Sequence, residues 1–584
     1  MKIKEVESTI LSYPKLASYL QEHPKELAQV QKILPEIAGD FNGEWVKNYI
    51  KIIDATFAKL YDGVSFDVPP DFDLNKLAEK YHLILVPNHQ SHADYLALTY
   101  VIYGVYSVPV YVAGGINLNV FPIGKLFRKG GAFFIRRSFN NDITYKLTFE
   151  AYVFYLLKNN LLIEFFFEGG RSRTGKLLRP RYGLFQMLLE AHAHIKDSKP
   201  LMFIPVTLAH EQVPESGAHA KELRGGKKKK ESASQLLKIF KVFSRKLGTI
   251  HVRFSQGIVI DKYDDLKSTV QNLAFDCFGS IAKAMPLTPM SLISLIMLDE
   301  PSGTMTWPLV EKRATAILDY CAHMKIPTSA SLDKDKYINS TKHALDILIE
   351  NNKVELIIKE NLKETFYSIL PKARAELLYF KNMIIHHFLV PAIMNGAWFN
   401  VNNGSFKTVK DLSSYLITQR KELKYEFYLP SVKEFLFQSL KVASYALKED
   451  ITDLKQCLSL GNEKMVQMSQ TLKLFSSTFV YIYEAYYLGA TSVYFLKNET
   501  FDKKRFLAVA RDLFEVEREY GRIVHYYESY ATPMLLNSLE FFTNLNCIES
   551  PGTGLYYIDN EEILNKYKDK FSKDVNEKIS MGLH

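Results

Sequence analysis

The chain has 584 residues, 47% of them hydrophobic and 23% charged, with a formal net charge of +9 at pH 7. This length excludes a single small core and predicts two or three domains, and the hydrophobic content excludes extensive disorder. The four cysteines, Cys277, Cys321, Cys457 and Cys547, are too far apart for a metal or redox motif, so we expect separate thiols in a reducing compartment.

Three regions follow one another along the chain. Residues 1–65 are expected to be helical, because apolar side chains recur at helical spacing from Leu27 to Ile37. The first residues lack the apolar core of a secretory signal. Val68-Pro69-Pro70-Asp71 marks a boundary to an α/β domain at 66–270. Helical patterns then predict a large C-terminal domain at 271–584.

Short apolar runs alternate with helical patterns in the second region. Such runs predict strands buried in a mixed, mainly parallel sheet that is flanked by helices. The predicted strands are Leu83–Pro87, Val108–Ala113, Ala132–Ile135, Leu161–Phe167, Phe203–Leu208 and His251–Ile260.

A histidine and an aspartate five residues apart, His89 and Asp94, follow the first of these strands. Five helical steps turn a side chain by about 140° around the axis, so the two cannot share one face of a regular helix. At a junction between strand and helix, His89 lies in the turn and Asp94 in the first helical turn. The carboxylate can then hold the imidazole in one tautomer and leave its other nitrogen free to take a proton.

The same segment allows two other interpretations. Ser91-x-x-Asp94 matches a capping box for the following helix. His92 adds a third side chain that can bind a metal, but the spacing departs from the familiar His-x-His-x-Asp-His arrangement. We therefore predict no metal.

Arginines and glycines follow two further strands. Gly130-Gly131 precedes the strand Ala132–Ile135, which ends in Arg136 and Arg137, and paired guanidinium groups suit a phosphate. Glu168-Gly169-Gly170-Arg171-Ser172-Arg173-Thr174-Gly175-Lys176 combines backbone donors with cations, as phosphate-binding loops do. It nearly matches a nucleotide P-loop, but Leu177 stands where a Mg²⁺-binding Ser or Thr is required.

One basic segment fits either a solvated surface loop and helix or attraction to an anionic surface, which could be lipid headgroups, a coenzyme phosphate or an acidic carrier protein. Ten Lys or Arg residues and two Glu lie between Lys221 and Lys246, and no nucleic-acid motif accompanies them. Three apolar stretches, Met290–Leu298, Met383–Phe399 and Phe475–Leu496, are expected to be buried or interfacial helices. The last is long enough to leave a membrane span open, but it contains Glu484, several tyrosines and many hydroxyls.

Taken together and in this order, these segments resemble the four sequence blocks of the glycerolipid acyltransferase superfamily. The blocks are the His-x4-Asp motif at His89 and Asp94, Gly131–Arg137, Phe166–Ser172 and Ile204–Val206. Three further segments are similar to the bacterial glycerol-3-phosphate acyltransferases: Ala113–Asn119, Ala220–Gly225 and Tyr379–Phe388. The likeness is strong over residues 55–400. The region before the α/β domain is shorter than in common bacterial members.

The resemblance implies a glycerol-3-phosphate 1-O-acyltransferase that uses acyl-CoA or acyl carrier protein and yields lysophosphatidate, the first step of phospholipid synthesis. It implies that His89 is the general base, that Asp94 orients it, and that no cofactor or metal is needed besides the acyl thioester co-substrate. It also implies a set of substrate-binding residues: Arg136, Arg137, Glu168, Gly169, Arg171 and Ser172. Arg136 favours glycerol-3-phosphate or dihydroxyacetone phosphate as the acceptor, since enzymes that acylate lysophosphatidate often have Asp there.

Two alternatives stay open: dihydroxyacetone phosphate as the acceptor, and an inactive scaffold that binds lipid. The sequence does not choose between the two acyl donors. The expected partners are glycerol-3-phosphate, the donor and a membrane lipid surface, with no nucleic acid. We expect peripheral or monotopic attachment at the cytoplasmic face of the inner (plasma) membrane.

Overall fold

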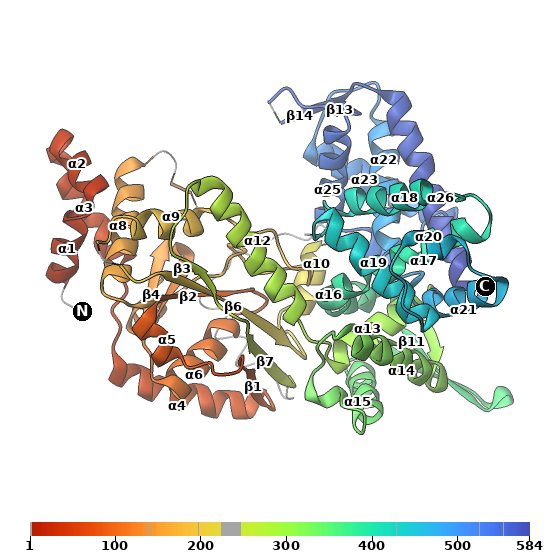
Figure 1. The fold of residues 1–584 in the computed structure, drawn as a ribbon, viewed down its shortest axis with the longest axis horizontal. Coiled ribbons are helices and arrows are strands. Elements are labelled where there is room, and N and C mark those ends of the chain that lie inside the picture. The colour runs from red at the N-terminus through yellow and green to blue at the C-terminus, as the bar shows by residue number, and fades with distance from the viewer. Residues whose placement is uncertain are drawn as a thin grey trace. The chain divides into compact units, whose positions relative to one another are not determined.

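The computed structural model describes residues 3–136, 138–139, 142–196, 198–223, 247–427, 429–524, 526–552 and 554–583. Contacts divide these residues into two compact units, which we treat separately (Figure 1). The first unit contains residues up to 172, residues 177–214, and the described residues up to Met285. The second contains residues 173–176, the segment that begins at Glu215, and the chain from Pro286 onward. The predicted three-part division into 1–65, 66–270 and 271–584 stays a prediction.

The first unit begins with helices and continues as an α/β fold. Its helices are α1 (Ile3–Leu11), α2 (Pro14–Glu22), η1 (Pro24–Glu26), α3 (Leu27–Ile37), α4 (Gly43–Leu60), α5 (Leu74–Lys80), α6 (Asp94–Tyr106), η2 (Ile116–Leu118), α7 (Ile123–Lys129), α8 (Ile143–Lys158), α9 (Gly183–His192) and α12 (Leu266–Ala284). Its strands are β1 (Gly63–Asp67), β2 (His82–Pro87), β3 (Val110–Gly115), β4 (Ala132–Ile135), β5 (Leu162–Glu164), β6 (Leu201–His210), β7 (Thr249–Phe254) and β8 (Ile258–Ile260).

Within the described residues these strands form one eight-stranded sheet in the order β1-β7-β6-β2-β5-β3-β4, with β8 paired to β6. β2 runs parallel to β5 and β6, and β3 runs parallel to β4 and β5. Only β7 and β8 pair with β6 in antiparallel fashion. The prediction of a mixed, mainly parallel sheet flanked by helices is confirmed. Because the carboxyl ends of parallel strands meet at one edge, the turns after β2, β3, β4 and β5 share that edge.

Two strand predictions were wrong in detail. The run His251–Ile260 is two strands, β7 and β8, because Gly257 interrupts the pairing between them. The strand β1 was not predicted, because residues up to 65 were expected to be helical. Gly63–Asp67 pairs with β7 as a half-exposed edge strand and lacks a strong apolar pattern.

Helices cover both faces of the sheet. In Figure 1, α4 and α6 lie on one side, and α8 and α9 lie on the other, next to the N-terminal α1, α2 and α3. The face under α6 packs aliphatic residues of β2 and β6 with Leu98, Val101 and Ile102. The opposite face is aromatic: Phe165 of the chain after β5 contacts Phe185 at 4.9 Å between ring centroids.

The second unit is mainly helical, as predicted. Its helices are α10 (Ser216–Leu223), α13 (Pro289–Asp299), α14 (Trp307–Met324), η3 (Ala330–Leu332), α15 (Tyr337–Glu350), η4 (Glu360–Leu362), η5 (Pro371–Ala373), α16 (Arg374–Ile384), η6 (Ile385–Phe388), α17 (Leu389–Asn402), α18 (Val409–Leu423), α19 (Val432–Leu447), α20 (Leu454–Leu458), α21 (Asn462–Leu472), η7 (Lys473–Phe475), α22 (Val480–Phe495), α23 (Lys503–Glu519), α24 (Tyr526–Ser529), α25 (Thr532–Asn544) and α26 (Glu561–Leu583). Two small antiparallel sheets accompany them: β10 (Val354–Lys359), β11 (Glu364–Ile369) and β9 (Thr304–Thr306), then β12 (Phe501–Asp502), β14 (Leu555–Ile558) and β13 (Ile548–Glu549).

The three apolar stretches lie inside this unit. Every residue of α13 from Pro289 to Leu298 is buried, and α22 is buried along almost its whole length. Among the described residues, Pro371–Asn402 is the one helical run long and apolar enough to cross a membrane, and 83% of its apolar window is buried. A core helix that is mostly buried meets the same criteria of length and hydropathy as a membrane span, and a buried or interfacial helix is what the sequence predicted.

Candidate active site

The site is built at the turn that follows β2. All six residues of β2 are buried, and Asn88 ends the strand by using its side-chain amide like a backbone group. Its Nδ2 donates to the carbonyl of Leu208 at 3.0 Å, and its Oδ1 accepts from the Leu208 N–H at 2.7 Å. These two hydrogen bonds to β6 fix the point at which the chain leaves the sheet, and they therefore fix the position of His89.

His89 and Asp94 lie together as the sequence predicted. His89 Nδ1 is 2.8 Å from Asp94 Oδ2, and the same oxygen accepts from the N–H groups of Gln90 at 2.6 Å and Ser91 at 2.9 Å. Asp94 is the first residue of α6, and its carboxylate binds both the turn that precedes the helix and the imidazole. The His89 side chain is 13% exposed, while that of Asp94 is fully buried.

The protonation of the pair follows from its contacts. Burial alone would raise the pKa of Asp94, but hydrogen bonds from His210 and His89 outweigh burial and hold that pKa well below its ordinary range. An ionised carboxylate can only accept, so Nδ1 of His89 carries the proton and Nε2 is left with its lone pair. The ring stacks on Phe166 at 4.0 Å between centroids, which fixes its plane.

The sequence did not reveal His210. It ends β6, is fully buried, and places Nε2 2.6 Å from Asp94 Oδ1, although 116 residues separate the two in the chain. Asp94 thus joins two imidazoles through its two oxygens. The sequence feature that could have identified His210 is its place just beyond the predicted strand Phe203–Leu208. Because β6 lies beside β2 and runs parallel to it, a histidine at this place falls at the same sheet edge as His89.

Glu164 was also missed. It ends β5, pairs in register with Leu85 of β2, and is fully buried. Neither carboxyl oxygen has a hydrogen-bond partner among the described residues. Burial, and next the negative charge of Asp94, raise the pKa of Glu164 to about 8, so this carboxyl is mostly neutral at pH 7.

The loop after β5 lies directly against the histidine. The Ser172 N–H donates to the carbonyl of His89 at 2.8 Å, and Ser172 is buried. Gly169 adopts φ +68°, a left-handed conformation that lets the loop turn above Phe166. Burial raises the pKa of Glu168 well above its ordinary range, although the N–H groups of His89 and Leu178 partly offset it. Glu168, Gly169, Arg171 and Ser172 are therefore brought to the His89 turn.

Arg136 is placed differently. It follows β4, which is three strand positions from β2, about 14 Å at the usual spacing of about 4.8 Å. Its guanidinium binds both carboxyl oxygens of Glu36 at 2.7 Å and Asp142 at 3.1 Å, and it lies over the ring of Tyr145. Arg137 lies outside the described residues, as does most of the basic stretch that ends at Lys246.

The end of the glycine- and arginine-rich segment belongs to the second unit. Lys176 is buried there and binds Glu426 at 2.5 Å, and the Thr174 carbonyl accepts from Asn382 at 2.8 Å. Gly175 adopts φ +82°, and any Cβ on it would overlap the carbonyl of Tyr379. A P-loop lysine must be available to a nucleotide phosphate, so the buried ion pair of Lys176 argues against that alternative.

Among the residues that the structure describes, no group of three or more His, Cys, Asp or Glu is arranged to hold a metal ion. The four cysteines are free and buried.

Comparisons with known proteins match both halves of the chain. The family model described as glycerol-3-phosphate acyltransferase C-terminal region matches residues 219–550, and the model described as acyltransferase matches residues 72–209. The crystal structure of the 1-acyl-sn-glycerophosphate (LPA) acyltransferase PlsC from Thermotoga maritima is similar at 16% identity over 39% of this chain and 76% of that chain. Its TM-score of 0.24 is too low to carry an argument. Because the first model covers more than half of the sequence and the second contains the His89 turn, the chain belongs to the glycerol-3-phosphate acyltransferase family and is an acyltransferase of glycerolipids.

Proposed function

We propose that this enzyme is a glycerol-3-phosphate 1-O-acyltransferase, which moves a fatty acyl group from acyl-CoA or acyl carrier protein to the sn-1 hydroxyl and forms lysophosphatidate. The observation that carries the proposal is the bond of 2.8 Å between His89 Nδ1 and the buried Asp94 carboxylate. It leaves a partly exposed imidazole with one basic nitrogen, which is what a general base for an alcohol requires.

The reaction needs no covalent acyl-enzyme. Nε2 of His89 takes the proton of the sn-1 hydroxyl while the oxygen forms a bond to the thioester carbonyl carbon. The carbon–sulfur bond then breaks, and the imidazolium returns its proton to the departing thiolate. Asp94 stabilises the imidazolium between these steps, and it stays ionised because its own pKa is held low.

The phosphate of the acceptor is assigned to the arginines. Arg171 comes from the loop whose Ser172 N–H binds the His89 carbonyl, so a phosphate held there lies close to the base. A fixed phosphate positions the hydroxyl and reduces the entropy cost of the reaction. Arg136 is the second candidate and needs release from Glu36 before it can bind phosphate.

His210 is proposed as a positioning residue. Its N–H satisfies the carboxyl oxygen of Asp94 that His89 does not use. With both oxygens bound, the carboxylate cannot rotate away from the imidazole. Without it, a buried acceptor would lack a donor, which typically costs about 1–3 kcal/mol.

Activity of the purified full chain in detergent tests the proposal, with glycerol-3-phosphate and each acyl donor in turn. The His89→Ala variant should lose about 10²–10⁴-fold in kcat, the usual contribution of a general base. The His82→Ala variant is the matched control, because His82 begins the same strand and binds Ser198 Oγ at 2.8 Å. Normal turnover by the His89 variant would reject the assignment, and turnover only with dihydroxyacetone phosphate would change the acceptor.

A further inference from the structure

The segment between β3 and β4 presents an apolar tip to solvent. We call Val120–Leu126 the α7 tip. Phe121 is 78% exposed, the highest fraction among the large hydrophobic side chains described, and Val120 and Leu126 are 51% and 43% exposed. Contiguous exposed apolar surface of this kind typically marks an interaction site.

The tip is held in this shape by its own contacts. The Gly124 N–H donates to the Val120 carbonyl at 2.7 Å, and a Cβ on Gly124 would lie 2.8 Å from Asn119 Cα. On its inner side, Arg128 donates to the Glu36 carbonyl at 2.6 Å. The exposure of Val120 and Phe121 is therefore imposed by a tight, anchored turn.

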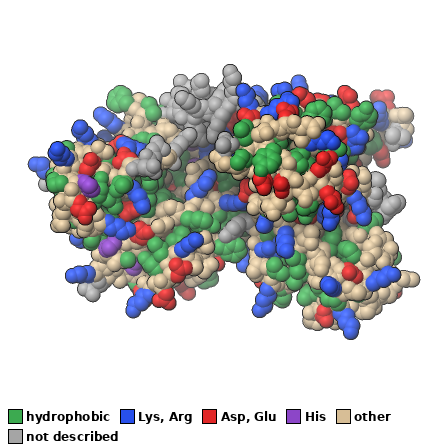
Figure 2. Space-filling model, turned by 90° about the horizontal axis from the view of Figure 1, so that it is seen from above, with side chains coloured by type: hydrophobic (Ala, Val, Ile, Leu, Met, Phe, Trp, Pro, Cys, Tyr) green, Lys and Arg blue, Asp and Glu red, His purple; other side chains and the backbone are tan. Residues whose placement is uncertain are grey.

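Along the chain, the charged residues on either side of the tip have one sign, although Arg136 is paired with Glu36 and Asp142. Residues 95–141 contain no Asp or Glu, whereas Lys125, Arg128, Lys129, Arg136 and Arg137 lie among them. Lys125 is exposed, with its Nζ 5.3 Å from the centre of the Phe121 ring. By contrast, Figure 2 shows Lys, Arg, Asp and Glu side chains interspersed over the face seen from above. An apolar tip flanked by lysines complements an anionic lipid surface, which offers hydrocarbon beneath negative headgroups.

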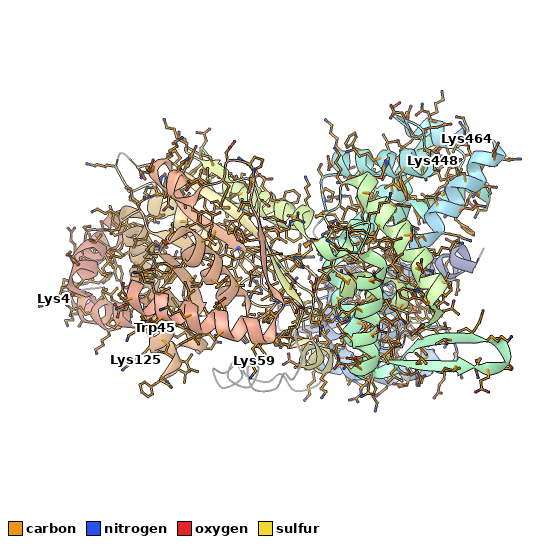
Figure 3. The ribbon with its side chains drawn as sticks, turned by 90° about the horizontal axis from the view of Figure 1, so that it is seen from below. Lys4, Trp45, Lys59, Lys125, Lys448 and Lys464 are labelled. Atoms are coloured by element: carbon orange, nitrogen blue, oxygen red, sulfur yellow. The ribbon has the colours of Figure 1, made fainter. Side chains whose placement is uncertain are left out.

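An aromatic pair continues this surface. Trp45 of α4 stacks on Tyr49 at 4.7 Å between ring centroids, and its ring lies 3.5 Å from where a Cβ of Gly130 would be, at the end of α7. Figure 3 shows Trp45 and Lys125 toward the same edge of the first unit. Trp and Tyr side chains are favoured at the level of lipid headgroups.

The tip also lies near the proposed base. β3 and β2 are both parallel to β5, so the turn that leads to the tip leaves the same sheet edge as the turn that carries His89. Phe127 of α7 contacts Tyr95 at 5.8 Å between ring centroids, and Tyr95 follows Asp94 directly. A bilayer bound at the tip would lie beside the edge at which the acyl group is transferred.

We propose that the α7 tip docks the enzyme on an anionic lipid bilayer, with Val120, Phe121 and Leu126 inserted among the headgroups and Lys125 bound to lipid phosphate. This inference rests on the proposed function, because it assigns a membrane surface to an enzyme with amphiphilic substrates.

Flotation of the full chain with vesicles tests it, using phosphatidylcholine alone and phosphatidylcholine mixed with phosphatidylglycerol, without substrate. The Phe121→Ser/Leu126→Ser variant should bind the mixed vesicles at least tenfold more weakly. Lys125→Glu should weaken binding severalfold to the mixed vesicles only. The matched controls are Phe437→Ser and Lys441→Glu, because Phe437 is 51% exposed and Lys441 Nζ lies 4.6 Å from its ring centre. Both controls should bind like the wild type.

Equal binding by the tip variants and the wild type would overturn the inference, as would equal losses in the controls. A concentration-dependent dimer that the tip variants abolish would instead identify the surface as a contact between copies. Acyltransferase activity in detergent distinguishes the two proposals. The tip variants should keep this activity, because their membrane binding is not needed there. A wild type without this activity would refute the proposed function, and the flotation result would still test the docking surface.

Discussion

Two fully buried carboxyl groups lie at neighbouring strand ends and have opposite environments. Asp94 receives four hydrogen bonds, from two imidazoles and two backbone N–H groups, and its pKa is lowered. Glu164 has no hydrogen-bond partner among the described residues, and its pKa is raised to about 8. Burial acts on both in the same direction, so the donors around Asp94, and the charge of Asp94 near Glu164, decide which carboxyl is ionised at pH 7.

The difference shows how the site confines negative charge. A second carboxylate near Asp94 would be repelled by it, since the charge of Asp94 already raises the pKa of Glu164, and it would also repel the phosphate of the acceptor. Keeping Glu164 neutral leaves one anion in contact with the imidazole. Pairs of carboxyls with separated pKa values are typical of sites that carry out proton transfer.

Removing the charge of Asp94 tests most directly whether activity depends on one ionised carboxyl beside a neutral one. In Asp94→Asn the amide no longer requires the proton of His89 on Nδ1, and the imidazolium loses its counter-charge. We expect kcat to fall by about 10²–10⁴-fold with a smaller change in KM. Steady-state kinetics with a thermal melt of the same sample measure both effects.

Asp73→Asn is the matched control for that variant. Asp73 also accepts hydrogen bonds from two backbone N–H groups, those of Asn75 and Lys76, but no imidazole bond to it is found among the described residues. It should lose some stability and keep its turnover. A kcat within fivefold of the wild type in Asp94→Asn would show that the carboxylate only holds the turn before α6.

Substitution of His210 tests whether the second oxygen of Asp94 matters. His210→Ala leaves that buried oxygen without its donor, so we expect about a tenfold loss of kcat and a changed pH profile. His210→Gln offers an amide donor and should recover much of the activity. A loss of stability in both variants with unchanged kcat and pH profile would make His210 a purely structural residue.

The sequence predicted what depends on neighbours along the chain. His89 and Asp94 are five residues apart, and the turn between a strand and a helix was enough to predict their contact. β2, β4 and β6 were found because continuous apolar runs are typical of strands buried on both faces. The loop Glu168–Ser172 was identified because it directly follows a predicted strand, Leu161–Phe167.

What the sequence missed depends on pairing between distant segments. His210 reaches Asp94 only because β6 lies beside β2, an order that no local pattern encodes. Glu164 was taken as part of an apolar run, since a neutral buried carboxyl looks like any other Glu in the sequence. Arg136 was predicted as a phosphate ligand, which stays a prediction, but its bond to Glu36 was not foreseen because it joins residues 100 positions apart.

Glu164→Gln sharpens the contrast through pH rather than activity. Between the ordinary pKa of 4.5 and the raised value of about 8, the folded protein holds a proton on Glu164 that the unfolded chain has lost. Its burial therefore destabilises the wild type progressively as pH rises across that interval, and Gln removes the effect. We expect the melting temperature of the variant relative to the wild type to increase from pH 5 to pH 9. Turnover at pH 7 should change little, and a pH-independent difference in melting temperature would show that Glu164 titrates normally.

Arg136 allows a similar test on a cation, because its guanidinium already binds Glu36 and Asp142. Glu36 and Arg136 are both partly exposed, with side chains 27% and 34% accessible, so their ion pair contributes only about 0–1 kcal/mol to stability. If Arg136 binds the acceptor phosphate, Glu36→Gln removes one of the two carboxylates that hold the guanidinium, and the KM for glycerol-3-phosphate should fall about two- to threefold with kcat unchanged. Arg136→Ala should raise that KM, while Glu44→Gln, which removes the separate surface pair with Lys47, should change neither constant. Acceptor saturation curves for the three variants decide the matter: unchanged KM in both Glu36→Gln and Arg136→Ala would leave Arg136 as a tie between β4 and α3, and would assign the phosphate to the loop that carries Arg171.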